Sequence, residues 1–133
     1  MSKSLIYAVN TAAQAVVDGG TVVLSSIVRR YGCNVALAAG GVNVNGAGYY
    51  DIDANVTFTA GGDGTALLEV LRDGVPIPGA NSSIGVANGV VYTLPVHAVD
   101  REFCACTGGS TISMRLSGVA TTVTNAAMVV TKE

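Results

Sequence analysis

Hydrophobic and polar residues alternate along several short segments of the chain, most clearly in residues 49–59. The apolar positions of this segment are Tyr50, Ile52, Ala54, Val56 and Phe58. The intervening positions are Tyr49, Asp51, Asp53, Asn55 and Thr57. Because successive side chains of a β-strand point to opposite faces, this period of two predicts a strand that buries one face and exposes the other. Residues 111–117 alternate in the same way, with Ile112, Met114 and Leu116 at the apolar positions.

Two other segments are apolar at both sets of positions. In residues 90–99, the set Tyr92, Leu94 and Val96 opposes the set Val91, Pro95 and Val99. In residues 126–130, the pair Ala127 and Val129 opposes Ala126, Met128 and Val130. A strand that is apolar on both faces needs a partner on each side, and we interpret the second partner as another copy of the chain. With two leucines from a predicted strand at 65–71, the predicted oligomer interface comprises Val91, Pro95, Val99, Leu67, Leu71, Ala127 and Val129.

Glycine separates these segments from one another. Many of the 17 glycines stand in pairs that favour turns, including Asn45-Gly46, Asp73-Gly74 and Asn88-Gly89. Short strands at such spacing are typical of a β-sandwich or barrel. Residues 10–17 contain good helix formers, but the segment is short and ends at a glycine pair, which favours extended structure. We therefore predict an all-β, antiparallel fold with a single domain over residues 1–133.

The composition favours self-association and argues against nucleic acid. Half of the 133 residues are hydrophobic and 12% are charged, against about 25% in an average globular chain. A surface with so few charges is covered by small polar residues or buried against other subunits. The net charge is −2, and Arg29-Arg30 is the only adjacent basic pair, so the chain offers no basic patch for phosphates.

The chain also lacks the signals for a membrane. No apolar run approaches the roughly 20 residues that span a bilayer. Residues 1–7 lack the long apolar core of a signal peptide. We therefore expect synthesis in a bacterial cytoplasm without a signal peptide, no membrane partner, and release by lysis or by assembly into a particle.

Asp51 and Asp53 form the most suggestive pair of carboxylates. At positions i and i+2 of a strand they share a face, roughly 6.5–7 Å apart. Such a pair could hold a cation or act as an acid and a base. Neither residue belongs to a metal-loop pattern, so we interpret the pair as part of a solvated outer face and predict no metal site within one chain. If three chains meet around an axis, these two residues are the candidates to line it.

The three cysteines are Cys33, Cys104 and Cys106. An odd number is poor evidence for a closed disulfide framework, and the Cys-x-Cys spacing at 104–106 does not match the usual zinc pattern. We interpret the cysteines as buried thiols. A metal site, an interchain disulfide and a disulfide to Cys33 remain the alternatives.

The remaining candidates do not combine into a catalytic site. His97 is the only histidine, and no nucleophile or orienting acid accompanies it in sequence. Ser82 and Ser83 stand outside any Gly-x-Ser-x-Gly motif. The segment 61–64, Gly-Gly-Asp-Gly, is followed by a predicted strand, whereas a phosphate loop needs a helix and usually a lysine. We therefore predict a protein without cofactor that is not an enzyme.

Residues 48–58 resemble the central strand of the C1q/TNF-like jelly roll, which typically begins with Gly-x-Tyr and then alternates. Residues 68–79, 90–96 and 125–131 resemble later strands of that family. The chain departs from the family in having only 5% aromatic residues. The resemblance implies an antiparallel jelly-roll sandwich that forms a compact homotrimer.

A second resemblance is to proteins of Gram-positive gut bacteria and their prophages. It rests on residues 29–33 and 48–51, on the cysteine cluster near residue 104, and on the C-terminal Lys132-Glu133. It implies a structural protein on the surface of a phage particle, as a capsid decoration, a head fibre or a receptor-facing knob. The partners implied are phage capsid or tail proteins and a host surface glycan. The alternative is a carbohydrate- or ligand-binding module of a bacterial surface or spore-coat protein, which uses residues 61–64 and 78–83.

Overall fold

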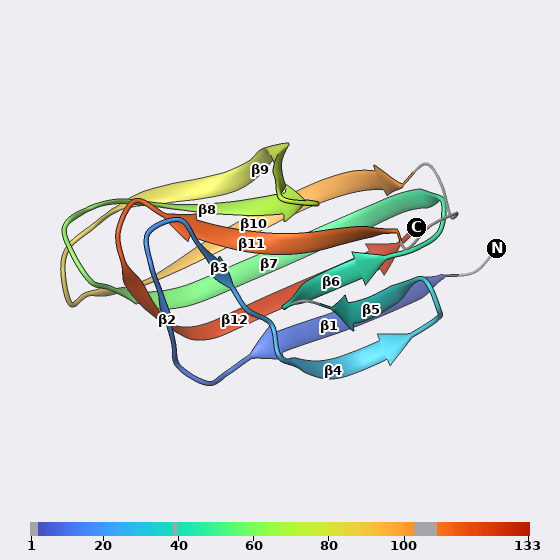
Figure 1. The fold of residues 1–133 in the computed structure, drawn as a ribbon, viewed down its shortest axis with the longest axis horizontal. Coiled ribbons are helices and arrows are strands. Elements are labelled where there is room, and N and C mark those ends of the chain that lie inside the picture. Colours follow the sequence, from blue (N-terminus) through green and yellow to red (C-terminus); the bar gives the residue numbers. More distant parts are fainter. Residues whose placement is uncertain (1–2, 39, 103–108) are drawn as a thin grey trace.

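The computed structural model describes residues 3–38, 40–102 and 109–133, which form two β-sheets packed face to face (Figure 1). The strands are β1 (Ser4–Asn10), β2 (Gln14–Val16), β3 (Gly20–Val22), β4 (Ser26–Tyr31), β5 (Val35–Ala38), β6 (Gly41–Val44), β7 (Gly48–Ala60), β8 (Gly64–Arg72), β9 (Val75–Val86), β10 (Val91–Glu102), β11 (Ser110–Ser117) and β12 (Thr121–Lys132). None of the described residues belongs to a helix long and apolar enough to cross a membrane.

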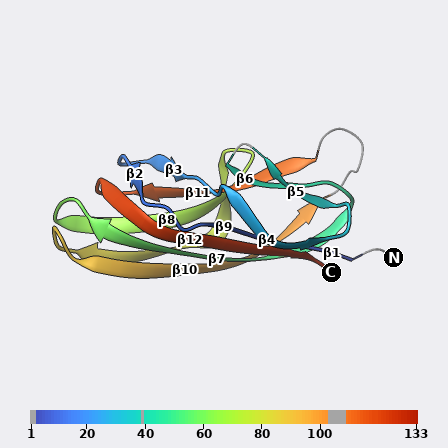
Figure 2. The same ribbon diagram turned by 90° about the horizontal axis from the view of Figure 1, so that it is seen from below.

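The strands pair in an order that differs from their order along the chain. Sheet A runs β10-β7-β12-β1-β4, with β2 beside one end of β12. Sheet B runs β5-β6-β11-β8-β9, with β3 beside β11. The chain therefore crosses repeatedly between the two layers, which Figure 2 shows edge-on. Every pairing is antiparallel, and the arrangement confirms the predicted all-β jelly-roll sandwich.

Strand β7 is the central strand of sheet A. It pairs with β10 along residues 48–59 and with β12 along residues 50–60. Its predicted inner set is buried against sheet B: Tyr50, Ile52, Val56 and Phe58 are 0% exposed and Ala54 is 4% exposed. The alternation in residues 111–117 is confirmed too, because Ile112, Met114 and Leu116 face the same core. The period of two therefore identified the core face of both sheets.

The other local predictions hold with one exception. Residues 10–17 are extended at the end of β1 and in β2, and residues 61–63 form the turn before β8. The segment 78–83, however, lies inside β9, although a Pro-Gly pair usually marks a turn. Gly79 adopts a φ of +79° there, and the pairing between β8 and β9 shifts register beside it. A bulge in β9 thus accommodates the Pro-Gly pair without a turn.

A polar cluster around Arg72 of β8 joins the two sheets at one end of the sandwich. The Arg72 guanidinium donates from Nη2 to Glu102 Oε1 at 3.1 Å and from Nη1 to the Arg101 carbonyl at 3.0 Å. Ser110 of β11 donates to the other oxygen of Glu102 at 2.7 Å. Asp100 lies 3.5 Å from Arg72 Nε, and burial raises the pKa of its carboxyl although Arg72 opposes that shift. The buried Glu102 is therefore satisfied by groups of the opposite sheet.

The two adjacent leucines of β8 provide a test of the register. Leu68 is 0% exposed in the core, whereas Leu67 points to the opposite side of sheet B and is half-buried. We expect Leu68→Ala to lower the free energy of unfolding by about 2–5 kcal/mol, because it leaves a cavity in the core. Leu67→Ala should cause a distinctly smaller loss. Chemical denaturation followed by far-UV circular dichroism measures both, and equal losses would contradict this register.

Candidate functional site

The candidate site is the side of sheet A that faces away from sheet B. In the central part of this side, the strand registers place twelve residues, three from each of four strands. We call this set the outer face of sheet A: Leu5, Tyr7 and Val9 of β1, Ala127, Val129 and Thr131 of β12, Asp51, Asp53 and Asn55 of β7, and Pro95, His97 and Val99 of β10.

These residues form three rows across the sheet. The first row is Val9, Ala127, Asn55 and Pro95. The middle row is Tyr7, Val129, Asp53 and His97. The third row is Leu5, Thr131, Asp51 and Val99. Aliphatic, aromatic and small side chains therefore surround a few charged groups, which is unusual for the solvated side of an antiparallel sheet.

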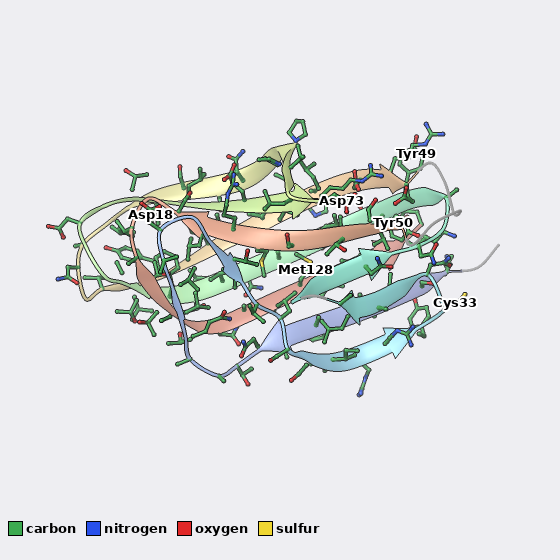
Figure 3. The ribbon with its side chains drawn as sticks, in the orientation of Figure 1. Asp18, Cys33, Tyr49, Tyr50, Asp73 and Met128 are labelled. Atoms are coloured by element: carbon green, nitrogen blue, oxygen red, sulfur yellow. The ribbon has the colours of Figure 1, made fainter. Side chains whose placement is uncertain are left out.

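Several apolar side chains on this side of sheet A are well exposed. Val99 is 53% exposed, Tyr7 is 36% exposed, and Val91, further along β10, is 59% exposed. Tyr49 and Tyr50 are successive residues of β7 that take opposite directions in Figure 3. Tyr50 is buried and donates to the Gly46 carbonyl, whereas Tyr49 is 51% exposed beneath the Arg101 guanidinium, 5.4 Å from its ring centre. The exposed apolar surface thus continues beyond the three rows.

The predicted interface residues divide between the two sheets. Five of them lie on the outward side of sheet A: Val91, Pro95, Val99, Ala127 and Val129. Ala127 is largely buried within one chain, because only 8% of it is exposed. Leu67 and Leu71 pair with Ser117 and Ser113 on the outward side of sheet B. The seven predicted residues therefore lie on two different faces of the molecule, and a contact of Leu67 with another chain stays a prediction.

Leu71 also requires a correction of its own. Only 6% of Leu71 is exposed, so the chain itself covers most of the surface that was assigned to a partner. The register shift between Glu69 and Leu71 pairs Leu71 with Pro76 of β9. Alternation of apolar residues does not reveal such a shift. Whether the five residues of sheet A contact another chain stays a prediction.

His97 and Asp53 face each other on neighbouring strands in the middle row. His97 Nδ1 lies 2.6 Å from Asp53 Oδ1, and the two side chains are 61% and 67% exposed. The hydrogen bond to Asp53 raises the pKa of His97, and the negative charges of Asp53 and Asp51 act in the same direction. The prediction that His97 lies in a strand is confirmed. Its acidic partner could not be predicted, because only the register between β7 and β10 pairs the two residues.

Asp51 lies on the same face as Asp53, as predicted, but the two carboxylates have different partners. The hydrogen bond between Glu133 and Asp51 is the main cause of the raised pKa of Glu133, and the negative charge of Asp51 raises it further. The Glu133 backbone holds this position by donating from its N–H to the Tyr49 carbonyl at 2.9 Å. Within residues 3–38, 40–102 and 109–133, no group of three or more His, Cys, Asp or Glu side chains is placed to hold a metal ion.

The other candidate residues do not join this site. Ser82 and Ser83 belong to β9 of sheet B, whereas His97 lies on the outward side of β10 in sheet A. The segments 61–64 and 78–83, predicted to bind carbohydrate together, are not adjacent, because Gly64 pairs with Val86 while Glu69 pairs with Asn81. No pocket is found in the described part of the chain.

The cysteines require one correction. Cys33 is an exposed free thiol in the turn between β4 and β5, at the end of the sandwich where β1 begins and β12 ends (Figures 1 and 3). The prediction of a buried thiol is therefore wrong for Cys33. The chain reverses here at Gly32, whose φ is +81°, and this turn carries Cys33 to the surface. Cys104 and Cys106 lie outside the described residues, so their predicted state is untested.

Solved structures of similar fold include a crystal structure of murine APRIL, with a TM-score of 0.76 and 15% identity over 99% of this chain and 100% of that chain. Eiger TNF from S. frugiperda gives 0.69 and 11% identity over 98% and 91%. The globular domain of zebrafish complement 1qA gives 0.60 and 11% identity over 96% and 94%. The likeness confirms the C1q/TNF-like jelly roll as the fold. No family model and no curated protein matches the sequence.

The contact between His97 and Asp53 predicts a measurable titration. We expect NMR of the His97 ring to give a pKa above the usual 6.5, because Asp53 stabilises the protonated ring. Asp53→Asn should return the pKa towards 6.5, and Asp51→Asn should lower it less. The stabilisation of the fold by this pair is present below the unfolded-state pKa and is lost as the pH rises through the higher, folded-state pKa. An unchanged pKa in Asp53→Asn would contradict the contact.

Proposed function

We propose that this protein is a non-catalytic structural and binding domain that assembles into a homotrimer through the outer face of sheet A. The observation that carries the proposal is the apolar character of this face, where Val99 and Tyr7 remain exposed although one chain already has a complete core. Exposed apolar patches of this kind mark interaction sites in soluble proteins. The number of subunits comes from the resemblance to C1q/TNF-like domains.

The outer face of sheet A can supply part of one side of a stable interface. Such interfaces bury about 800 Å² on each partner and involve about 20–30 residues a side. The outer face of sheet A supplies twelve residues on four rigid strands, and the exposed Tyr49 and Val91 extend it. In a cyclic trimer each contact is heterologous, so the face of one copy meets a different surface of its neighbour. Burial contributes about 25 cal/mol for each Å² of apolar surface removed from water.

We further propose that the assembly belongs to the surface of a phage or phage-like particle, where it decorates the capsid, forms part of a head fibre or contacts the host. The low proportion of charged residues and the resemblance to prophage proteins support this placement. Loops at the ends of the sandwich would then be available to a capsid or tail protein on one side and to a host surface glycan on the other.

Two exposed valines test the self-assembly. Light scattering behind a sizing column should give the mass of three 13.3 kDa chains for the unaltered protein. Val99→Asp, on sheet A, should shift the mass towards that of one chain while circular dichroism stays unchanged, because it places a charge in the interface. Val75, at the start of β9 in sheet B, is 65% exposed, and Val75→Asp is the matched control that should leave the trimer intact. A single-chain mass for the unaltered protein would exclude self-assembly.

The particle location has a separate test. We expect peptides of this chain in phage particles that have been induced from the source bacterium, banded in a density gradient and analysed by mass spectrometry. Capsid, portal or tail genes should also lie beside its gene. Particles that contain their capsid and tail proteins but none of this chain would contradict the location while leaving the trimer untouched.

A further inference from the structure

The pair His97 and Asp53 occupies an unusual position for titratable groups. It lies in the middle row of the outer face of sheet A, with Pro95 and Val99 on either side of His97 along β10. Val129 is the next residue across the sheet from Asp53. A partner that covers the apolar residues of this face must therefore also cover the pair.

We infer that protonation of His97 strengthens self-assembly through the outer face of sheet A, so that the assembly tightens as the pH falls from the alkaline side through neutrality. This inference rests on the proposed function, because it concerns the same surface and the same partner, further copies of this chain.

The physical reason is the net charge that assembly would bury. With His97 neutral, covering the pair removes the single negative charge of Asp53 from water without a counter-charge, which is strongly unfavourable. With His97 protonated, the ring donates from Nδ1 to a carboxylate oxygen 2.6 Å away, and the buried pair has no net charge. In the free chain both side chains are well solvated, so either state is tolerated there. The assembled form should therefore hold the proton more tightly than the free chain.

The charged groups around His97 do not supply another counter-charge for Asp53. Strand β7 contributes a second carboxylate, Asp51, whose charge also favours the protonated ring. Strand β9, which packs against β10 from sheet B, contains no charged residue, and Arg72 of β8 is engaged with the acids on the inner side. Tyr7 lies in the same row on β1, separated from Asp53 by Val129. The remaining titratable groups on this side of the sheet lie outside the three rows: Lys3, Arg29, Tyr31, Tyr49, Arg101 and Glu133.

The direction of the effect follows from linkage. Asp53 already raises the pKa of His97 in the free chain, and burial of the pair in the assembly should raise it further. Association then takes up protons. Its equilibrium constant therefore increases as the pH falls through the pKa of His97 in the assembly, and it levels off below the pKa of His97 in the free chain. Each linked proton changes this constant by at most about tenfold for each pH unit.

The test is sedimentation equilibrium of the full chain at about pH 6 and about pH 8, between which histidine titrates and ordinary aspartates do not. We expect at least tenfold tighter association at the lower pH. His97→Asn should abolish the difference, and His97→Lys, which keeps a positive charge beside Asp53, should remain tightly associated at the higher pH. Asp53→Asn should also lose the tightening at low pH, because protonation would then bury an unpaired positive charge.

Two controls distinguish His97 from other acids. Glu69→Gln removes a carboxylate that pairs with Arg115 on sheet B, and it should leave both the assembly and its pH dependence unchanged. Glu133→Gln should retain the pH dependence, although Glu133 titrates on the same side of the molecule. If Glu133→Gln rather than His97→Asn removes the dependence, the inference is overturned.

The remaining outcomes separate the inference from the proposed function. Association that is equally strong at both pH values would overturn the role of His97 and leave the self-assembly standing. A single-chain mass at both pH values would overturn both. Association that weakens towards the lower pH would show that the pair opposes assembly when it is protonated, and would reverse the sign proposed here.

Discussion

The structure depends on the double pairing of β7. This strand hydrogen-bonds to β10 on one side and to β12 on the other, so its register fixes the register of sheet A. Its inner side chains, from Tyr50 to Phe58, form the centre of the core. Because a shift of one residue would turn that whole set outward, the buried face and the pairing specify each other. The positions of Asp51, Asp53 and Asn55 on the outer face are a consequence of the same constraint.

The fold of one chain does not require apolar residues on the outer face of sheet A. A sandwich is complete when the inner faces of its two sheets are covered, and the outer faces of antiparallel sheets are usually polar. On β10 and β12 four of the six outward positions in the three rows are instead occupied by Pro95, Val99, Ala127 and Val129. The exposed Val99 and buried core residues thus lie on the same strand, β10. Association would therefore use a surface that is held rigid by the folded sheet.

A sequence pattern predicts only the features that depend on residues close together in the chain. Alternation is a local property, so it identified the inner sets of β7 and β11 and placed His97 and the two aspartates in strands. The pairing of His97 with Asp53 depends on a register between residues 44 positions apart, which no local pattern contains. Leu71 was assigned to an interface from its apolar alternation with Leu67. The sequence does not reveal the bulge between β8 and β9 beside which Leu71 lies. Cys33 was expected to be buried because the default for free thiols ignores the turn that carries it to the surface.

Two clusters of charge in this molecule differ in what they can regulate. Around Arg72, the acids Glu102 and Asp100 are largely buried between the sheets, and the guanidinium stays charged at any pH that the fold tolerates. The permanent charge of Arg72 therefore holds the two sheets together through these acids. The pair of His97 and Asp53 is exposed in one chain, and its cation titrates close to neutrality. A change of pH near neutrality consequently acts on the surface proposed for assembly through His97.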